Sequence, residues 1–231
     1  MSLYWSRRCC LPWTRCWQTE VAALSLNLGV YLLPSAAGAY YAASGEQPDP
    51  SRQLLRALFR ERSATRLSEH SLLQLTGMED AERAQELLKR TQDLGWLQGL
   101  ERPRRCPEGA VEDLLPGLLE PLSNKGKAML ADGQGFYLGS AGFPHETAEE
   151  LSALSADLAS LQQRHSGLLL SNLGLGSGAW GVIDAAGNSR VGFWPLHVDE
   201  QRFALVIGGV PRMNQQALVN LVWILNQRYG Q

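Results

Sequence analysis

The residues that could do chemistry in this chain rarely stand at the spacing that chemistry requires. The G-x-G-x-x-G spacing of a dinucleotide-binding loop occurs at Gly176-Ser-Gly-Ala-Trp-Gly181. That loop needs a strand before it and a helix after it, so that the pyrophosphate lies at the helix N-terminus. Here the apolar pattern predicts a helix before the run and a strand after it. We therefore expect a flexible loop at this position.

Other reactive groups are isolated from one another. The sequence has no G-x-x-x-x-G-K-S/T phosphate loop, so we do not expect the chain itself to be a P-loop GTPase. Ser140 and Ser177 lie in glycine-rich turns, but neither belongs to a G-x-S-x-G elbow. The histidines are scattered one per predicted element, at His70, His145, His165 and His197. We expect no catalytic and no cofactor-binding residue.

The four cysteines form no recognisable site. Cys9, Cys10 and Cys16 lie near the N-terminus, and Cys106 stands alone. There is no C-x-x-C pair and no histidine at metal spacing from them, so neither a zinc site nor a disulfide framework is indicated. Free thiols are typical of a reducing compartment, and we expect a cytoplasmic protein without a bound metal.

Composition bounds the chain to ordinary globular structure. It has 231 residues, 45% hydrophobic and 19% charged, which is enough for one large domain or two small ones. The net charge of −2 gives no general attraction to nucleic acid or to anionic membranes. Only residues 51–105 lean basic, with 11 basic and 8 acidic side chains.

Residues 1–50 allow three interpretations. Three arginines (Arg7, Arg8 and Arg15) precede the uncharged run Val21–Ser44, which contains Asn27 and Pro34. Its length would permit a membrane anchor through residues 21–44, and basic flanks also fit a cleaved export signal. The proline and the asparagine weaken a span. We favour a poorly structured extension and expect residues 1–45 to be dispensable for folding.

Residues 51–105 show a helical pattern. Leucines share one face after Ser51, a second helix is predicted from the N-cap Ser68 to Gly77, and a third over about Asp80–Leu94. A basic stretch follows, Arg102-Pro-Arg-Arg105. This order resembles a winged helix, a family whose third helix enters the DNA major groove while the wing touches phosphate. The resemblance implies nucleic-acid contacts at Arg83, Lys89, Arg90, Arg102, Arg104 and Arg105.

The same predicted third helix carries acidic side chains, which repel phosphate. They are Glu79, Asp80, Glu82, Glu86 and Asp93. Winged helices also bind proteins, so DNA binding and protein binding both stay open here, with DNA the less favoured.

Residues 106–125 form a linker and a leading helix that Pro116 and Pro121 should break. Beyond them, two apolar runs flank Asp132-Gly133, which predicts a tight type I′ hairpin. A helix with leucines at three- and four-residue spacing follows from about Glu146, and it continues, if the apolar pattern is followed, to Leu173. Three strand-like runs come next, and Pro195 in the middle one requires a bulge or a free edge. A last amphipathic helix starts near Asn214.

The order strand–strand–helix–strand–strand–strand–helix over residues 126–231 resembles the roadblock family, the dynein light chain-type domain also found in bacterial partners of small GTPases. The resemblance implies an α+β fold, with a five-stranded antiparallel sheet and flanking helices. It also implies a non-catalytic homodimeric scaffold or adaptor that binds a protein partner such as a small GTPase. A DNA-binding regulator, dimerised by the same domain, is the alternative.

Such dimers join through the second helix and the edge strand, here Ala179–Ala185. The expected interface residues are Leu151, Leu154, Leu158, Trp180, Val182 and Ile183. Alternatively, the segment Leu168–Leu175 covers that edge within one chain.

Overall fold

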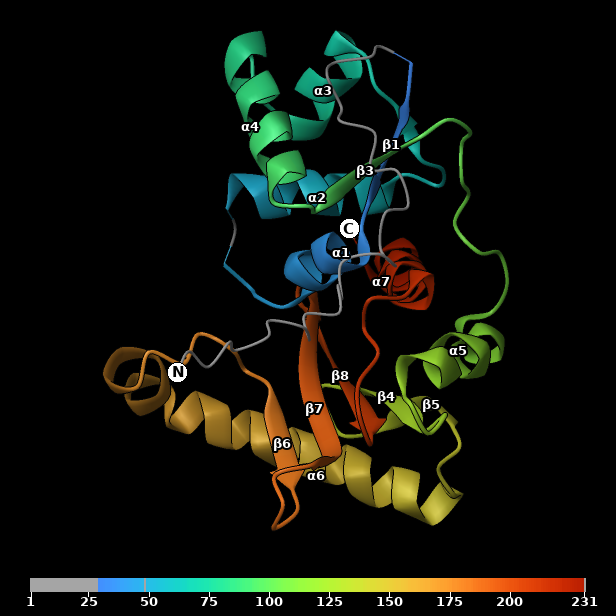
Figure 1. Cartoon of the computed structure of the whole chain (residues 1–231), viewed down its shortest axis with the longest axis vertical. Helices are drawn as coiled ribbons and strands as arrows, with labels where there is room; N and C mark the ends of the chain where they lie inside the picture. Colours follow the sequence, from blue (N-terminus) through green and yellow to red (C-terminus); the bar gives the residue numbers. More distant parts are fainter. Residues whose placement is uncertain (1–28, 48, 231) are drawn as a thin grey trace, which may run out of the picture.

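The computed structural model describes residues 29–47 and 49–230. Its first part combines helices with a small sheet of order β2-β1-β3 (Figure 1). The elements of this part are β1 (Tyr31–Pro34), α1 (Ala36–Ala43), α2 (Pro50–Arg60), β2 (Thr65–Arg66), α3 (Glu69–Thr76), α4 (Ala81–Asp93) and β3 (Leu97–Leu100).

Local capping explains where these helices begin and end. The Ser68 hydroxyl accepts a hydrogen bond from the Ser71 backbone N–H at the start of α3, and Gly77 ends that helix in the left-handed conformation, with φ of 63°. The Asp80 carboxylate caps α4, and Asp49 caps α2. The predicted helices over residues 68–77 and 80–94 are therefore present.

The strand pairing differs from a simple hairpin wing. The partner of β3 is β1, with Leu32 opposite Gly99, and β1 comes before the helices in the chain. After β3 the chain runs to an isolated bridge between Arg105 and Ser63. The winged-helix resemblance of this part stays a prediction.

The interpretation of residues 1–50 as an extension is wrong for residues 29–47. Strand β1 is the middle strand of the small sheet, and its Leu32 side chain is fully buried. Helix α1 buries Ala39, Ala42 and Ala43. Residues 1–28, with three of the cysteines and the start of the run Val21–Ser44, lie outside the described residues. Within residues 29–47 and 49–230, no helix is both long and apolar enough to cross a membrane.

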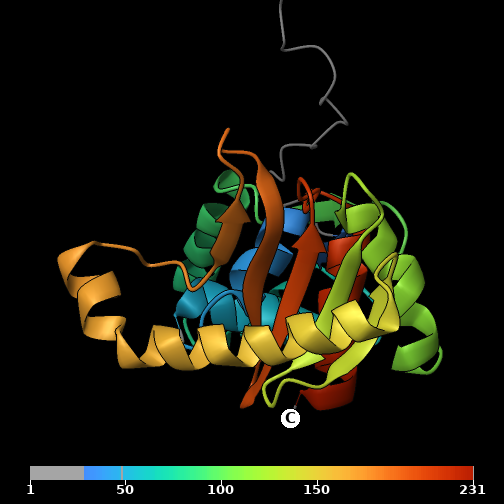
Figure 2. The ribbon, with the colours of Figure 1, turned by 90° about the horizontal axis from the view of Figure 1, so that it is seen from below.

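The second part is a five-stranded antiparallel sheet of order β5-β4-β8-β7-β6. Helix α6 covers one face, and α5 and α7 lie on the other (Figures 1 and 2). This is the predicted α+β fold. Its elements are α5 (Val111–Leu119), η1 (Glu120–Leu122), β4 (Ala128–Asp132), β5 (Tyr137–Ala141), α6 (His145–Arg164), η2 (Gly167–Asn172), β6 (Trp180–Ile183), β7 (Ser189–Val198), β8 (Gln201–Gly208) and α7 (Gln216–Tyr229).

Two details of the sheet bear on the predictions. The prediction of a tight turn at Asp132-Gly133 is wrong, because the loop extends to Phe136. The Asp132 carboxylate accepts hydrogen bonds from the backbone N–H groups of Gln134 and Phe136, and Gly135 takes the positive φ of 91°. Pro195 does lie at a free edge, because the pairing of β6 with β7 stops at Phe193.

The two parts share one continuous core through α7. Trp223 is fully buried against α2, and its indole N–H donates to the Glu61 carbonyl at 2.8 Å. The Gln227 amide donates to the Phe59 carbonyl, also at 2.8 Å. The first part therefore begins at β1 and rests on the sheet domain, although its core was expected to start at Ser51.

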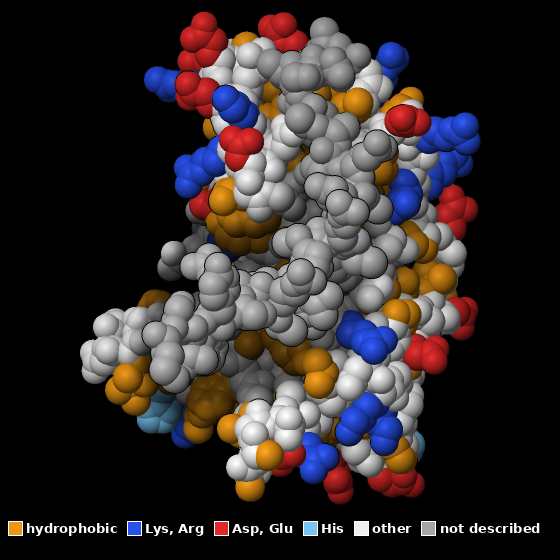
Figure 3. Space-filling model, in the orientation of Figure 1, with side chains coloured by type: hydrophobic (Ala, Val, Ile, Leu, Met, Phe, Trp, Pro, Cys, Tyr) orange, Lys and Arg blue, Asp and Glu red, His pale blue; other side chains and the backbone are white. Residues whose placement is uncertain are grey.

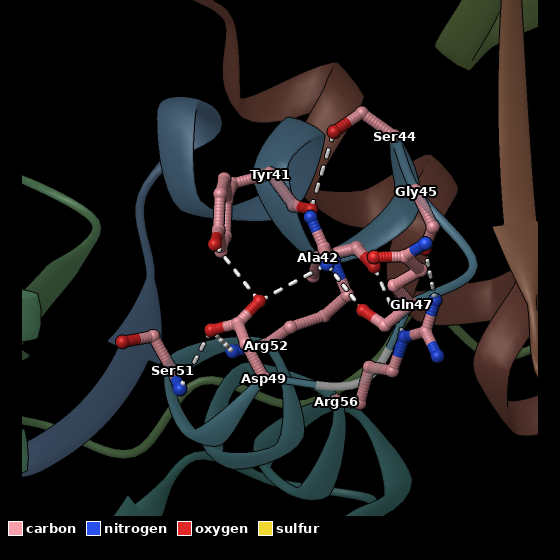
Figure 4. A network of polar contacts seen from close by, with 9 residues as sticks. All are labelled: Tyr41, Ala42, Ser44, Gly45, Gln47, Asp49, Ser51, Arg52 and Arg56. Carbon is pink, nitrogen blue, oxygen red and sulfur yellow. Dashed lines mark hydrogen bonds and ion pairs between the residues drawn. The ribbon is translucent and has the colours of Figure 1, made fainter. Parts of the chain in front are cut away.

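The link between α1 and α2 is held by two arginines (Figure 4). Arg52 donates to the Tyr41 carbonyl at 3.2 Å, and Arg56 donates to the carbonyls of Ala42 and Gly45 at 3.0 and 2.8 Å. These are carbonyls at the end of α1 that lack helical partners, so the side chains satisfy them directly. Burial lowers the pKa of Arg56, although far too little to discharge a guanidinium at neutral pH.

Replacing Leu32 by Ala should lower the free energy of unfolding by about 3 kcal/mol, because it leaves a cavity under β1. Leu94, which is 48% exposed, provides the control. Leu94→Ala should change the free energy of unfolding by no more than about 0.5 kcal/mol. Urea unfolding followed by circular dichroism measures both. Equal effects of the two substitutions would contradict a structural role for β1.

Candidate functional site

The open edge of the large sheet is the most distinctive surface of the described chain. Strand β6 pairs with β7 on one side, and no described strand pairs with it on the other. Its Val182 and Ile183 side chains are 52% and 66% exposed. An unpaired apolar strand is a template for another strand, so this edge needs a partner.

Helix α6 continues past this edge. It crosses the sheet and runs beyond β6, and η2 follows at its end (Figure 2). Four leucines there, Leu168, Leu170, Leu173 and Leu175, are each about half exposed. Together with Val182 and Ile183 they make up what we call the apolar edge surface, and hydrophobic side chains are seen at the lower left of Figure 3. The sequence carries no acidic or basic residue from Ser166 to Ile183.

The six expected interface residues divide into two groups. Leu151, Leu158 and Trp180 pack between α6 and the sheet, against a buried cluster that includes Met129 and Phe193. Leu154, Val182 and Ile183 are exposed and available to a partner. Trp180 is further tied to α6, because its indole N–H donates to the Gln162 side chain at 3.1 Å.

The η2 leucines belong to this surface but were not among the expected interface residues. Their apolar run predicted that α6 continues to Leu173. In the structure this segment contains the separate π-helix η2. The alternative in which the segment Leu168–Leu175 covers the edge predicts burial, whereas these leucines are exposed and the segment forms no strand with β6. The signal that could have found them is the absence of charge across the whole run.

The expected nucleic-acid residues do not form one patch. Arg83, Lys89 and Arg90 lie on α4, whereas Arg102, Arg104 and Arg105 follow β3 on the other side of the first part (Figure 1). All six are exposed. Arg83 also contacts the Asp80 carboxylate at 3.4 Å. A single duplex would therefore not meet all six with one face of this part.

The reactive groups stay dispersed in the described part of the chain. The glycine run 176–181 leads from η2 into β6, as expected for a loop and not for a dinucleotide site. Burial raises the pKa of the Cys106 thiol to about 11, which keeps it protonated at neutral pH. Among the described residues, no group of three or more His, Cys, Asp or Glu side chains could hold a metal ion.

His197 differs from the other histidines because its side chain is largely buried. Its side chain is 11% exposed and lies 3.3 Å from the Glu46 carboxylate. Burial lowers the pKa of His197, and the nearby guanidinium groups of Arg202, Arg56 and Arg52 act in the same direction, while Glu46 opposes them. Since burial is the largest of these causes, the imidazole is neutral at pH 7.

No family model matches this sequence, and no curated protein matches it. Two solved structures are similar to part of it. The roadblock/LC7 domain from Streptomyces avermitilis is 15% identical, with a TM-score of 0.38, over 53% of this chain and 100% of that chain. Myxococcus xanthus MglB is 19% identical, with a TM-score of 0.30, over 51% of this chain and 82% of that chain. The α+β fold itself rests on the strand order and the helix placement described above.

Stability should fall as the pH drops through the range in which His197 titrates. A histidine whose folded pKa lies below its unfolded value of about 6.5 binds the proton better in the unfolded chain, so acid favours unfolding. Urea midpoints at pH 7.5 and pH 5.5 should differ less in His197→Gln than in the wild type. His165→Gln, which changes an exposed histidine, should keep the wild-type difference. If His197→Gln showed the same difference between the two urea midpoints as the wild type, the pH effect could not be assigned to His197.

Proposed function

We propose that this protein is a non-catalytic homodimeric scaffold that binds another protein. The apolar edge surface carries the proposal. An uncharged surface of this kind, at an unpaired strand, is characteristic of protein–protein contact sites. A second copy of the chain can cover this surface, because a two-fold axis places the same strand and the same leucines opposite each other.

The position of the first part decides which face of such a dimer remains available. Helices α1 and α2 pack against α7, so the α5/α7 side of the sheet is already occupied near its centre. Helix α6 lies alone on the opposite face (Figure 2). In a dimer joined through β6, the two α6 helices share one side of a continuous sheet. We place the protein partner on that side.

The outer face of α6 gives this partner a chemical character. Residues 146–157 of α6 carry exposed carboxylates, and the first basic side chain of the helix after His145 is Arg164. The carboxylates are Glu146, Glu149, Glu150 and Asp157. A partner with a basic surface would complement them. On the roadblock resemblance, we propose a small GTPase as the partner class. The separation of the basic residues in the first part favours protein binding over DNA binding.

Val182→Asp should convert the dimer to a monomer, because the interface would then bury an unpaired carboxylate. Val210, which is 53% exposed and lies outside the apolar edge surface, supplies the matched control Val210→Asp. Light scattering on a sizing column should give twice the 25.4 kDa chain mass for the wild type and for Val210→Asp, and one chain mass for Val182→Asp. Circular dichroism checks that both variants are folded. A wild type that is monomeric at high concentration would refute the dimer.

Small GTPases from the same source should bind the purified protein, and the binding should weaken when the α6 carboxylates are neutralised. Calorimetry with each GTPase loaded with GDP, or with a non-hydrolysable GTP analogue, measures this. The variant combines Glu146→Gln, Glu149→Gln and Glu150→Gln; the control replaces Glu108, Glu112 and Glu120 by Gln. The pure protein should not turn over GTP. Steady hydrolysis that is lost on changing one of its own residues would overturn the scaffold proposal.

A further inference from the structure

The face of α6 that lies against the sheet changes its chemistry along the helix. Over residues 148–158 this face packs on the sheet through Ala148, Leu151 and Leu158, with the buried Ser152 and Ser155 between them. Near the end of α6, Gln162 and Gln163 line the cavity described next, and Ser166, just beyond the helix, lines it as well. Towards the β6 edge the leucine contacts thus give way to the amide groups of Gln162 and Gln163.

The sheet changes in the same place. His197 of β7 and Arg202 of β8 are directly opposite each other in the register. Both side chains line a cavity of about 320 Å³, together with the polar end of α6 and with Glu46 from the α1–α2 link. This volume lies at the lower end of the range of small-molecule sites.

The half-buried Arg202 side chain lines this cavity. No hydrogen bond or ion pair ties its side chain to any of the described residues, and its interaction with Glu46 acts at longer range. Burial lowers the pKa of Arg202 despite that carboxylate. A guanidinium carries five N–H donors in a planar fork that matches carboxylate and phosphate groups. None of its nitrogen atoms is fully buried, so these donors are accessible to a ligand in the cavity.

The electrostatic surroundings favour an anion at this point. Arg52 and Arg56 act on His197 with the same sign as Arg202. Glu46 is the one carboxylate that lines the cavity, and its side chain is 76% exposed, which places it at the mouth. Arg202 is thus the one cationic side chain among the residues that line the cavity, and the side formed by α6 is neutral and rich in hydrogen-bonding groups.

We propose that this cavity binds a small molecule through one oxyanion group, a carboxylate or a phosphate, held by the Arg202 guanidinium. Gln162, Gln163 and Ser166 bind its neutral remainder by hydrogen bonds. The ligand contacts the α1–α2 link as well as the sheet, so its binding stabilises the contact between the two parts. This site is independent of the dimer proposed above, and neither result decides the other.

Calorimetric titration of the full chain with inorganic phosphate and, separately, with acetate tests the site, at constant ionic strength set by sodium chloride. At least one of the two should bind saturably below about 20 mM. Binding of phosphate alone or of acetate alone identifies the oxyanion. No saturable binding of either would overturn the proposal.

Three variants tie the binding to the cavity. Arg202→Gln should weaken it about tenfold or more, because it removes the charged donor. Gln162→Glu places a carboxylate in the cavity, and that carboxylate can still accept the hydrogen bond from the Trp180 indole N–H. This variant should therefore weaken anion binding to a similar degree. It tests the site even if Arg202→Gln does not fold. Arg212→Gln changes an exposed arginine outside the cavity and should bind as the wild type does. Unchanged affinity in Gln162→Glu, or an equal loss in Arg212→Gln, would refute the assignment.

Discussion

Helix α7 is the element on which both parts of the structure depend. A helix at the surface of a domain needs one apolar face, yet α7 buries every residue from Leu221 to Asn226. One side packs on the sheet and the other on α1 and α2, so the helix has almost no solvent side over that stretch. Trp223 shows the consequence, because its ring fills the space beside Phe59 while its N–H satisfies the Glu61 carbonyl. Removing the first part would expose this apolar side to water.

The predictions succeeded where the signal was local and failed where distant segments meet. Caps such as Ser68 and Gly77 act within a few residues, so the helices of residues 68–94 could be predicted. The place of β1 could not, because Leu32 pairs with Thr65 and Gly99, far along the chain, and an uncharged run of this length fits several structures. Similarly, the helical period indicated which residues of α6 are apolar. Only the sheet determines that Leu158 faces inward while Leu154 faces out.

The first part also constrains how the sheet domain can be used. A three-layer domain of this kind has two outer faces and two sheet edges at which a partner could bind. Here α1 and α2 add a fourth layer beyond α7, which removes much of one face from contact. On the same face α5 packs over β5, closely enough that a methyl group on Gly139 would lie 2.8 Å from the Leu115 side chain. The β6 edge and the outer face of α6 adjoin each other, so one partner can contact both.

The link between α1 and α2 bears on whether the cavity beside α6 can bind reversibly. Its conformation is fixed from within the first part, because Arg52 and Arg56 satisfy the carbonyls at the end of α1 and Asp49 accepts a hydrogen bond from the Tyr41 hydroxyl. Glu46 belongs to this link, and its carboxylate lies 3.3 Å from His197. The contact between the two parts rests on α7 and not on a ligand. A site whose walls are held by other contacts pays little ordering entropy on binding, which allows a small molecule with few groups to bind measurably.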